Sequence, residues 1–483
     1  MPRIISSARV ASLVGDFDRS PAYAGLSDAL RGLVADGRIA HDVRLPSERE
    51  LTRALGVSRT TITRAYADLR DRGYADSLRG SGTFTRIPGG PGRTPDRVLT
   101  PRVDRTDGID LIDLNCAAAA SAPGLAAAYD SAIGELPAYL AGHGYYPVGL
   151  PELQRAIAAT YDARGLPTDP DQIMVTPGAL AATALVARAT TGPADRVLVE
   201  NPVYPNAAKA LSLRSTRLVP ATVDVDGWDL EGIDATIRQT SPRAAYLIPD
   251  FQNPTGNLMG DAQREECAAL LARTHTLAIV DEAHQSLALE GQPMPRPLAA
   301  HVEAAGGEAI TIGSASKTFW GGLRMGWIRA PKRRLDALTE ARLTLDLGTP
   351  VLEQLVLTEL LRAPDEMLGI HRERLRAQRD GLAKALRIHL PEWQFRLPAG
   401  GLSLWCELPR AAAVALAVEA ESRGVAFAPG PAFSVEGGYD RFVRLPYTRD
   451  VPDLAEAVTR LAAAWASAPS ATGRRTTDRV MVA

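Results

Sequence analysis

Several features that narrow a protein's function are scarce or missing in this chain. Only three cysteines occur in 483 residues, and Cys116, Cys267 and Cys406 lie far apart and match no metal-ligand spacing. We therefore expect no metal site, and buried free thiols in a reducing compartment. No apolar run reaches the roughly 18 residues that a membrane helix needs. Arg9 and Asp16 interrupt the only apolar patch near the N-terminus, which argues against a signal peptide and predicts a cytoplasmic protein.

Excess charge of one sign is also missing. The formal net charge is −2, so the chain as a whole is not built to bind a polyanion. A hydrophobic fraction of 46% and a charged fraction of 23% are typical of soluble globular proteins. A length of 483 residues is too great for one ordinary domain and predicts two or three.

Positive charge is nevertheless concentrated in one short region. Residues 43–86 contain nine arginines against five acidic residues, a surplus typical of a nucleic-acid footprint. Apolar periodicity predicts three helices, at 21–35, 47–55 and 58–71. A glycine-containing turn joins the last two, and a hairpin follows over 76–86, which together predict a winged helix-turn-helix within residues 15–86. Residues 87–109, rich in Pro, Gly and Arg, are predicted to be a linker.

The same region carries a family motif. The segment LPSERELTRALGVSRTTITRAYADLRDRGY, followed by GSGTF, resembles GntR-type DNA-binding domains. In such domains the N-terminal part of the recognition helix meets base edges and phosphates. The resemblance implies double-stranded DNA as a partner, and as contacts Arg49, Ser58, Arg59, Thr60, Thr61, Arg64 and, on the wing, Gly82. Each of these residues could instead belong to a solvated helix face, and that alternative stays open.

A single lysine lies among small and hydroxylic residues in the stretch GSASKTFWGGLRMG. Lys317 can form a Schiff base with an aldehyde, while Ser314, Ser316 and Arg324 can hold the oxygens of a phosphate. Upstream, an apolar run ends on Asp281, a carboxylate that can pair with a protonated pyridine nitrogen and keep the ring an electron sink. This pattern suits a bound aromatic phosphate whose aldehyde must meet an amine.

Three further turns supply possible contacts. Residues 175–180 are typical of a strand, a turn and a helix start, whose free N–H groups near Gly178 and Ala179 bind phosphate well. Asn253, in an Asn-Pro-Thr-Gly turn, can reach a ring hydroxyl. Tyr204 could lie on the pyridine ring or pack beneath its own turn, and both readings stay open.

The second half of the chain has an α/β pattern. Helices alternate with expected strands near 197–200, 244–249, 277–281 and 309–313. This alternation predicts a parallel sheet that binds ligands at the carboxyl ends of its strands. A charged stretch at 371–379 is expected to be a solvated helix face. Residues from about 365 to 468 predict a small α+β subdomain, and residues 469–483 are expected to be disordered.

The motifs around Gly178, Asn253, Asp281 and Lys317 resemble, in order and spacing, pyridoxal-phosphate (PLP) enzymes of the aspartate aminotransferase fold, fold type I. The resemblance covers about residues 110–468 and implies PLP held by Lys317 as an internal aldimine. Arg444, on an expected strand, then matches the arginine that takes a substrate's α-carboxylate. A strand arginine without an anion would be costly to bury.

Two further positions bear on this resemblance. Tyr145 matches a tyrosine that crosses to the partner subunit's phosphate, although plain packing remains an alternative. The family's usual tyrosine near the ring hydroxyl is absent, and His284 stands three residues beyond Asp281. We expect that histidine to donate a hydrogen bond and to titrate near neutrality. Ala179 offers the phosphate no hydroxyl.

A GntR-type DNA-binding domain that precedes a fold-type-I domain resembles the MocR/GabR family of bacterial transcriptional regulators. The resemblance implies a head-to-tail homodimer, PLP as cofactor, and an amino acid or PLP itself as effector. Two other functions compete: a working aminotransferase with an appended DNA-binding domain, and a DNA-binding protein whose second half is a scaffold without cofactor. The effector, the operator, the sign of regulation and any surviving transamination stay open.

Overall fold

The computed structural model describes residues 3–469 apart from residues 37, 40, 79–80, 89–110, 214 and 363–364. Most of the predicted linker, and the predicted tail beyond residue 469, lie outside this described part. The chain divides into two units, residues 1–95 with 121–131, and residues 96–120 with 132–483. Among the described helices, none combines the length and hydropathy that spanning a bilayer requires.

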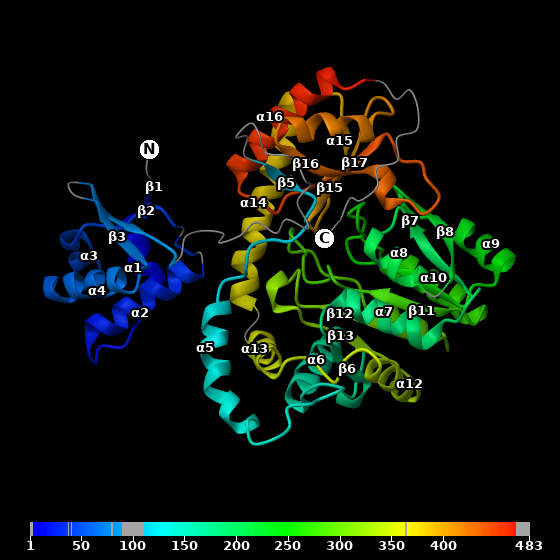
Figure 1. The fold of residues 1–483 in the computed structure, drawn as a ribbon, viewed down its shortest axis with the longest axis horizontal. Helices are drawn as coiled ribbons and strands as arrows, with labels where there is room; N and C mark the ends of the chain where they lie inside the picture. The colour runs from blue at the N-terminus through cyan, green and yellow to red at the C-terminus, as the bar shows by residue number, and fades with distance from the viewer. Residues whose placement is uncertain are drawn as a thin grey trace. The chain divides into compact units, whose positions relative to one another are not determined.

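The first unit contains the predicted winged helix-turn-helix, blue in Figure 1. Its elements are β1 (Arg3–Ile4), α1 (Ser7–Val14), α2 (Ala22–Ala35), β2 (Val43–Arg44), α3 (Glu48–Leu55), α4 (Arg59–Asp71), β3 (Ala75–Leu78) and β4 (Gly82–Thr85). The strands form one sheet in the order β1-β2-β4-β3. Val10 and Val14 of α1 belong to the same buried core, so the predicted start at residue 15 was too late.

Local sequence explains the turn between α3 and α4. Ser47 and Glu50 form a capping box at the start of α3, which satisfies two backbone N–H groups. Gly56 ends α3 with φ 64°, a left-handed conformation that glycine adopts without strain. Ser58 caps α4 by accepting a hydrogen bond from the Thr61 N–H. These caps fix where the second helix of the motif begins.

The large sheet of the second unit has the order β6-β13-β12-β11-β10-β7-β8-β9. Its strands are β6 (Ile173–Thr176), β7 (Arg196–Asn201), β8 (Arg217–Asp224), β9 (Gly227–Trp228), β10 (Ala244–Leu247), β11 (Leu277–Asp281), β12 (Ala309–Ser314) and β13 (Gly326–Arg329). The central strands β8, β7, β10, β11 and β12 are parallel, as predicted. Strands β13 and β9 run antiparallel to their neighbours, which the prediction of a parallel sheet did not include.

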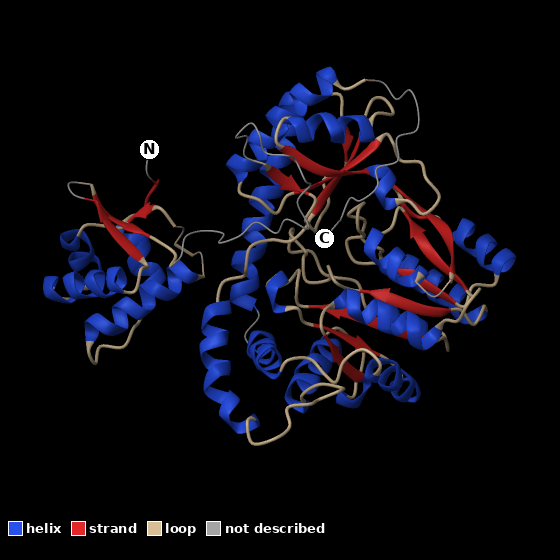
Figure 2. Ribbon diagram, in the orientation of Figure 1, coloured by secondary structure: helices blue, strands red, loops and turns tan. Residues whose placement is uncertain are grey.

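Helices surround this sheet in Figure 2. They are α6 (Pro151–Ala163), α7 (Ala179–Thr190), α8 (Pro205–Ser212), α9 (Leu230–Thr240), α10 (Asp261–Arg273), α11 (Leu298–Ala304), α12 (Lys332–Leu343) and α13 (Val351–Arg362). Helix α5 (Leu125–Glu135) spans the boundary between the two units. Short 3-10 turns occur at Leu136–Tyr139, Pro170–Gln172, Gly321–Leu323 and Gly430–Phe433. Strand β11 is buried along its whole length, as expected for a parallel strand covered on both faces. The carboxyl ends of the parallel strands meet at one edge, where Asp281 and Ser314 lie.

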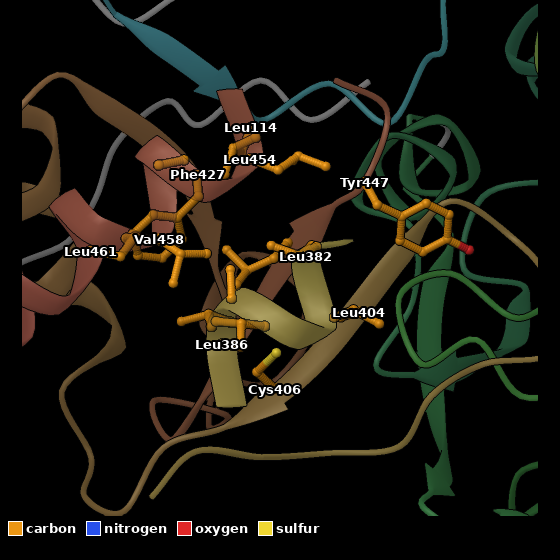
Figure 3. Packing of buried hydrophobic residues seen from close by; sticks show 14 of the residues in the cluster. Leu114, Leu382, Leu386, Leu404, Cys406, Phe427, Tyr447, Leu454, Val458 and Leu461 are labelled. Atoms are coloured by element: carbon orange, nitrogen blue, oxygen red, sulfur yellow. The ribbon is translucent and has the colours of Figure 1, made fainter. Parts of the chain in front are cut away.

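The small subdomain has a second sheet in the order β14-β15-β17-β16-β5. Its elements are α14 (Asp365–His389), β14 (Gln394–Phe395), β15 (Ser403–Glu407), α15 (Ala413–Ser422), β16 (Val425–Pro429), β17 (Phe442–Pro446) and α16 (Val451–Ser467). Strand β5 (Ile112–Leu114) joins its edge, parallel to β16. Figure 3 shows Leu114 of β5 packed with Phe427 and Leu454. The predicted bounds, 365–468, therefore omitted a strand that comes more than 250 residues earlier.

The charged stretch of α14 is not the solvated face that we predicted. His371 and Arg379 are 1% and 2% exposed. The Arg379 guanidinium is neutralised by Glu290 and Asp380 and donates to the carbonyl of Pro398. Buried charges persist where such partners surround them, and the sequence of one helix cannot show partners on other segments.

Candidate cofactor site and nucleic-acid interface

Lys317 lies in the turn that follows β12. Its Nζ donates to the carbonyl oxygen of Ala117 at 3.0 Å and forms no ion pair in the described part of the chain. Burial, together with the nearby guanidiniums of Arg444 and Arg324, lowers the pKa of Lys317 from 10.5 to about 8, against the opposing effect of Cys116 and Asp281. A lysine with a depressed pKa is a better nucleophile toward an aldehyde at neutral pH.

Asp281 ends β11 in a buried position. Its Oδ2 accepts a hydrogen bond from the Tyr246 hydroxyl at 2.5 Å, and its Oδ1 accepts one from the Ala283 N–H at 2.9 Å. Burial raises the pKa of the carboxyl group. Among the described residues no lysine or arginine forms an ion pair with it, so the carboxylate is available to a positively charged ring nitrogen. Tyr246 was not predicted, because nothing in the sequence pairs positions 246 and 281.

Gly178, Ala179 and Arg324 come together at the N-terminus of α7. Gly178 has φ 102°, and a Cβ at this position would lie 2.6 Å from Nη2 of Arg324. A Cβ on Gly326 would lie 2.7 Å from the backbone nitrogen of Ala179. Two glycines thus let a guanidinium and the first turn of a 12-residue helix approach the same space. Helix N–H groups together with an arginine fork form an anion site.

The carboxyl ends of β12 and β7, with the turns that follow them, carry Ser314, Ser316 and Tyr204. The hydroxyl oxygen of Ser314 accepts a hydrogen bond from the Ser316 N–H at 3.2 Å, which folds the turn that carries Lys317. Tyr204 follows β7, and burial raises its pKa. The charge of Arg444 acts to lower this pKa and that of Asp281 acts to raise it, so the Tyr204 hydroxyl lies within reach of both charged groups. The Tyr204 hydroxyl accepts from the Asn206 amide at 3.0 Å.

Arg444, on β17, is fully buried. Its guanidinium donates to the carbonyl of Asn115 and, at 3.4 Å, to Oδ1 of Asn253, and it lies 5.0 Å from the centre of the Phe433 ring. Its Nε has no hydrogen-bond partner, and no carboxylate in the described ranges pairs with it. Burial lowers the pKa of Arg444 to about 10, so the group stays charged at neutral pH. A buried cation without an anion is costly, so this position fits an anionic ligand.

His284 differs from our expectation. Burial, with a further contribution from Lys317, lowers its pKa to about 4, so the prediction that it titrates near neutrality is wrong. Its Nδ1 lies 3.0 Å from the carbonyl oxygen of Phe251. A carbonyl only accepts, so Nδ1 carries the proton and the other ring nitrogen of the neutral imidazole is an acceptor. We had expected this side chain to donate a hydrogen bond toward a ring hydroxyl. With Nδ1 used by the Phe251 carbonyl, the remaining ring nitrogen can only accept.

Tyr145 is separate from these groups within one protomer. Its side chain is 57% exposed, and its ring stacks on His143 with centroids 5.7 Å apart. The predicted role across a subunit boundary stays a prediction.

The residues that come together fit PLP. A nucleophilic amine, a buried unpaired carboxylate and an anion cradle converge at the carboxyl ends of the strands, beside the unpaired guanidinium of Arg444. Sequence analysis missed the segment 113–120, whose carbonyls hold Lys317 and Arg444. No residue-type signal marks it, because its contribution is made by backbone oxygens.

In the first unit, Arg49, Arg59, Thr60 and Arg64 are exposed on α3 and α4. The Nε of Arg59 lies 3.2 Å from Oε2 of Glu48, an exposed pair of the kind that contributes little to stability. Arg64 stacks its guanidinium 4.0 Å from the centre of the Tyr23 ring, which fixes its direction without neutralising its charge. These side chains are available to a polyanion.

The remaining predicted DNA contacts also have local structural roles. The hydroxyls of Ser58 and Thr61 lie 2.9 Å apart at the start of α4. Gly82 has φ 108°, and a Cβ there would lie 2.9 Å from Nε of Arg44. Arg44 is exposed and was not among the predicted DNA contacts. All of the individual DNA contacts stay predictions.

Comparison with known proteins places both halves in families. Residues 140–461 match the family of aminotransferases of class I and II, and residues 22–85 match the gntR family of bacterial regulatory proteins. The chain therefore belongs to the class I and II aminotransferase family, whose cofactor is PLP, and carries a GntR helix-turn-helix domain ahead of it. This combination is a fusion of the MocR type.

Several relatives span both halves. An uncharacterised HTH-type transcriptional regulator of Escherichia coli, YdcR, is 29% identical over 87% of this chain and 94% of its own length. The probable rhizopine catabolism regulatory protein MocR of Rhizobium meliloti is 27% identical, over 77% of this chain and 78% of its own. A 2-aminoadipate transaminase of Thermus thermophilus is 32% identical, over 60% of this chain and 75% of its own.

Solved structures agree with the fold. LysN, an α-aminoadipate aminotransferase from Thermus thermophilus solved with N-(5'-phosphopyridoxyl)-L-leucine, is 29% identical with a TM-score of 0.67. The similarity covers 73% of this chain and 92% of LysN. An archaeal alanine:glyoxylate aminotransferase is 26% identical with a TM-score of 0.66, over 74% of this chain and 91% of its own.

Proposed function

We propose that this chain is a PLP-dependent transcriptional regulator that senses an amino acid, or PLP itself, at Lys317 and reports it to DNA through α4. The observation that carries the proposal is Arg444, a buried cation without an anionic partner in the described part of the chain. It lies close enough to lower the pKa of Lys317. The GntR-type unit in the same chain gives this ligand site a DNA readout.

Each residue has a proposed part in holding the cofactor, which when bound supplies an electrophilic aldehyde and an electron-accepting ring. Lys317 supplies the amine, Asp281 faces the ring nitrogen, and Tyr204 and Asn253 contact the ring. The phosphate is held by Gly178, Ala179, Ser314, Ser316 and Arg324. His284 contributes an acceptor nitrogen near the ring, and Arg444 takes the α-carboxylate of the effector.

The proposed assembly is a head-to-tail homodimer in which Tyr145 reaches the partner's phosphate. Large apolar side chains support an interface near this residue. Leu140 is 70% exposed, and Leu343 and Leu345 are 51% and 61% exposed. Exposed apolar side chains of this size are typical of subunit interfaces.

The proposed coupling runs through the segment 113–120. It follows the predicted linker, and its carbonyls at Asn115 and Ala117 accept from Arg444 and from Lys317. A ligand that engages either cation replaces one of these hydrogen bonds. Because the segment follows the predicted linker in the chain, we propose that the exchange of these hydrogen bonds couples the ligand site to the DNA-binding unit. Effector binding can then shift DNA affinity by its differential affinity for the two arrangements.

The test is DNA affinity, measured by fluorescence anisotropy, of the PLP-loaded protein with and without each of the twenty common amino acids. Sensing at this site predicts that at least one amino acid, or PLP removal, changes the affinity at least fivefold. Equal affinity in every condition, with PLP bound or absent, would contradict the proposal. It would then favour an aminotransferase with an appended DNA-binding domain.

The exposed arginines of α4 allow a separate prediction. Arg59→Ala and Arg64→Ala should each weaken operator binding and reduce the slope of log affinity against log salt concentration by about 1, because each removes one phosphate contact. Arg217→Ala removes an exposed arginine from the other unit and serves as the matched control. Gel-shift titrations between about 50 and 200 mM salt measure the slope. Unchanged slopes in both variants would show that this face of α4 does not meet DNA.

The lowered pKa of Lys317 predicts how PLP capture depends on pH. Only the neutral amine attacks an aldehyde, so a pKa of about 8 leaves about a tenth of the molecules reactive at pH 7. A lysine at the ordinary value of 10.5 would leave about 0.03% reactive. Stopped-flow absorbance should show a capture rate that rises nearly tenfold per pH unit below about pH 8 and then levels off. A peptide lysine in the same buffers is the reference, and a rate that keeps rising to about pH 10 would contradict the lowered pKa.

A further inference from the structure

Tyr23 lies in the first turn of α2. Its spacing to Leu26 and Leu30 puts the three side chains on one face of this helix. Leu26 and Leu30 are fully buried, whereas Tyr23 is only partly buried and is not among the side chains that pack in the described core of the first unit. Core packing alone therefore does not account for an aromatic residue at this position.

The ring of Tyr23 contacts the guanidinium of Arg64 on α4. The Cζ atom of Arg64 lies 4.0 Å from the centre of the ring. Attraction between a cation and an aromatic face extends to about 6 Å, so this pair is well within range. The Tyr23 hydroxyl has no hydrogen-bond partner in the described part of the chain, so the contact depends on the ring.

The three arginines of α4 differ in what holds them. The Nε of Arg59 lies 3.2 Å from Oε2 of Glu48. Arg70 donates to the hydroxyl of Ser77 at 3.1 Å. Arg64 has no polar side-chain partner among the described residues. Because a guanidinium that lies on a ring keeps its positive charge and its in-plane N–H donors, Arg64 is oriented while it stays available to an anion.

Orientation matters because Arg64 is exposed. A long exposed side chain loses conformational freedom when it binds a ligand, which weakens binding by about twofold to tenfold for one such side chain. The ring restricts Arg64 before DNA binds, so less freedom is lost on binding. Contacts with phosphates also fix the register and orientation of a protein on the duplex. An arginine already directed toward a phosphate would therefore help to place α4 on DNA.

We propose that Tyr23 is a positioning residue for DNA binding, whose ring holds the Arg64 guanidinium in the direction in which it meets a backbone phosphate of duplex DNA. Tyr23 itself does not contact the DNA. This role rests on the proposed function, since it requires Arg64 to bind DNA. It also requires the aromatic face of Tyr23, whereas a packing role would require only the volume of the side chain.

Fluorescence anisotropy on the full-length, PLP-loaded protein tests this role. The probe is a duplex that the unmodified protein selects from a library of random sequence, and it is titrated at several salt concentrations. Tyr23→Leu should weaken binding about threefold to tenfold, because Arg64 is no longer restricted before it binds. The slope of log affinity against log salt concentration should stay unchanged, because the charge of Arg64 remains. Tyr23→Phe keeps the ring and should bind like the unmodified protein.

A double variant and a control make the result specific. Arg64→Ala with Tyr23→Leu should bind no more weakly than Arg64→Ala alone, since the ring acts only through the arginine. Phe17→Leu is the matched control, because Phe17 lies 5.6 Å from Cζ of Arg19, which is not a predicted DNA contact, in the same unit. Thermal unfolding shows that each variant is folded, and Tyr23→Met replaces Tyr23→Leu if the latter is not.

Three results would overturn the positioning role of Tyr23. They are equal affinity of Tyr23→Leu and the unmodified protein, equal weakening by Tyr23→Phe and Tyr23→Leu, and a further loss when Tyr23→Leu is added to Arg64→Ala. If Arg64→Ala itself has no effect, the proposed contact of Arg64 with DNA fails, and the role of Tyr23 fails with it. If Arg64→Ala weakens binding and Tyr23→Leu does not, only the role of Tyr23 is overturned.

Discussion

Lys317→Ala is expected to abolish covalent capture of PLP completely, while leaving both units folded. The side chain contributes one hydrogen bond to the carbonyl of Ala117 and no ion pair in the described part of the chain, so its loss costs little stability. Only its nitrogen can bond to the aldehyde carbon. After borohydride reduction and denaturation, the mass of the unmodified protein should include the phosphopyridoxyl group, and that of the variant should not.

The matched control for this experiment is Lys384→Ala, which removes an exposed lysine from α14. It should retain the full mass increase. The variant Lys317→Ala should also lose any change in DNA affinity that an amino acid causes, because the amine no longer exchanges with the ligand. A mass increase that survives in Lys317→Ala would assign the covalent site to another amine and remove the basis of the proposed sensing.

Arg444→Ala is expected to weaken binding of the amino-acid effector by about 30-fold or more, because a buried charge pair loses one partner. PLP capture should persist, since Arg444 is proposed to hold the effector and not the cofactor. Basal DNA affinity should also persist, because α4 is unchanged. Absorbance titration of the PLP-loaded protein with the responding amino acid measures the effect, and DNA anisotropy gives the response.

Two further variants make this result specific. Arg441→Ala, which removes a half-exposed arginine immediately before β17, should respond like the unmodified protein. Arg444→Lys keeps the charge but cannot form a bidentate contact with a carboxylate. Its affinity for the effector should lie between that of the unmodified protein and that of Arg444→Ala. If Arg444→Ala responds fully, the effector is not a carboxylate held at β17. PLP itself then becomes the signal to test.

Much of the fold follows from local pattern. The caps at Ser47 and Ser58 and the glycine turn between them predicted α3 and α4, and the apolar run before Asp281 predicted β11. Each of these patterns depends on residues only a few positions apart, so it can be recognised without knowledge of the tertiary structure. The antiparallel strand β13 and the edge strand β5 were missed, because their place depends on partners far away in the chain.

Site residues could be predicted where the function depends on a distinctive side chain. Lys317, Asp281 and Arg444 have unusual side chains for their settings, and the structure brings them together. His284 shows where this reasoning fails, because residue type suggests a titrating donor whereas burial makes it a neutral acceptor. The carbonyls of Asn115 and Ala117 carry no signal in the sequence at all, since every residue has one.

Strand β5 gives the chain a mechanical property. It pairs in parallel with β16 through Ile112, Asp113 and Leu114, so a pull directed along the strand loads its hydrogen bonds together in shear. Tension that enters β5 along the strand at Ile112 would therefore reach the carbonyls of Asn115 and Ala117 without first peeling the strand away. In the proposed homodimer, a DNA duplex whose half-sites hold the two DNA-binding units at a strained spacing is then expected to alter the hydrogen bonds that these carbonyls accept from Arg444 and Lys317. Coupling between two ligands is reciprocal. The factor by which the effector changes the affinity for a given operator would therefore equal the factor by which that operator changes the affinity for the effector.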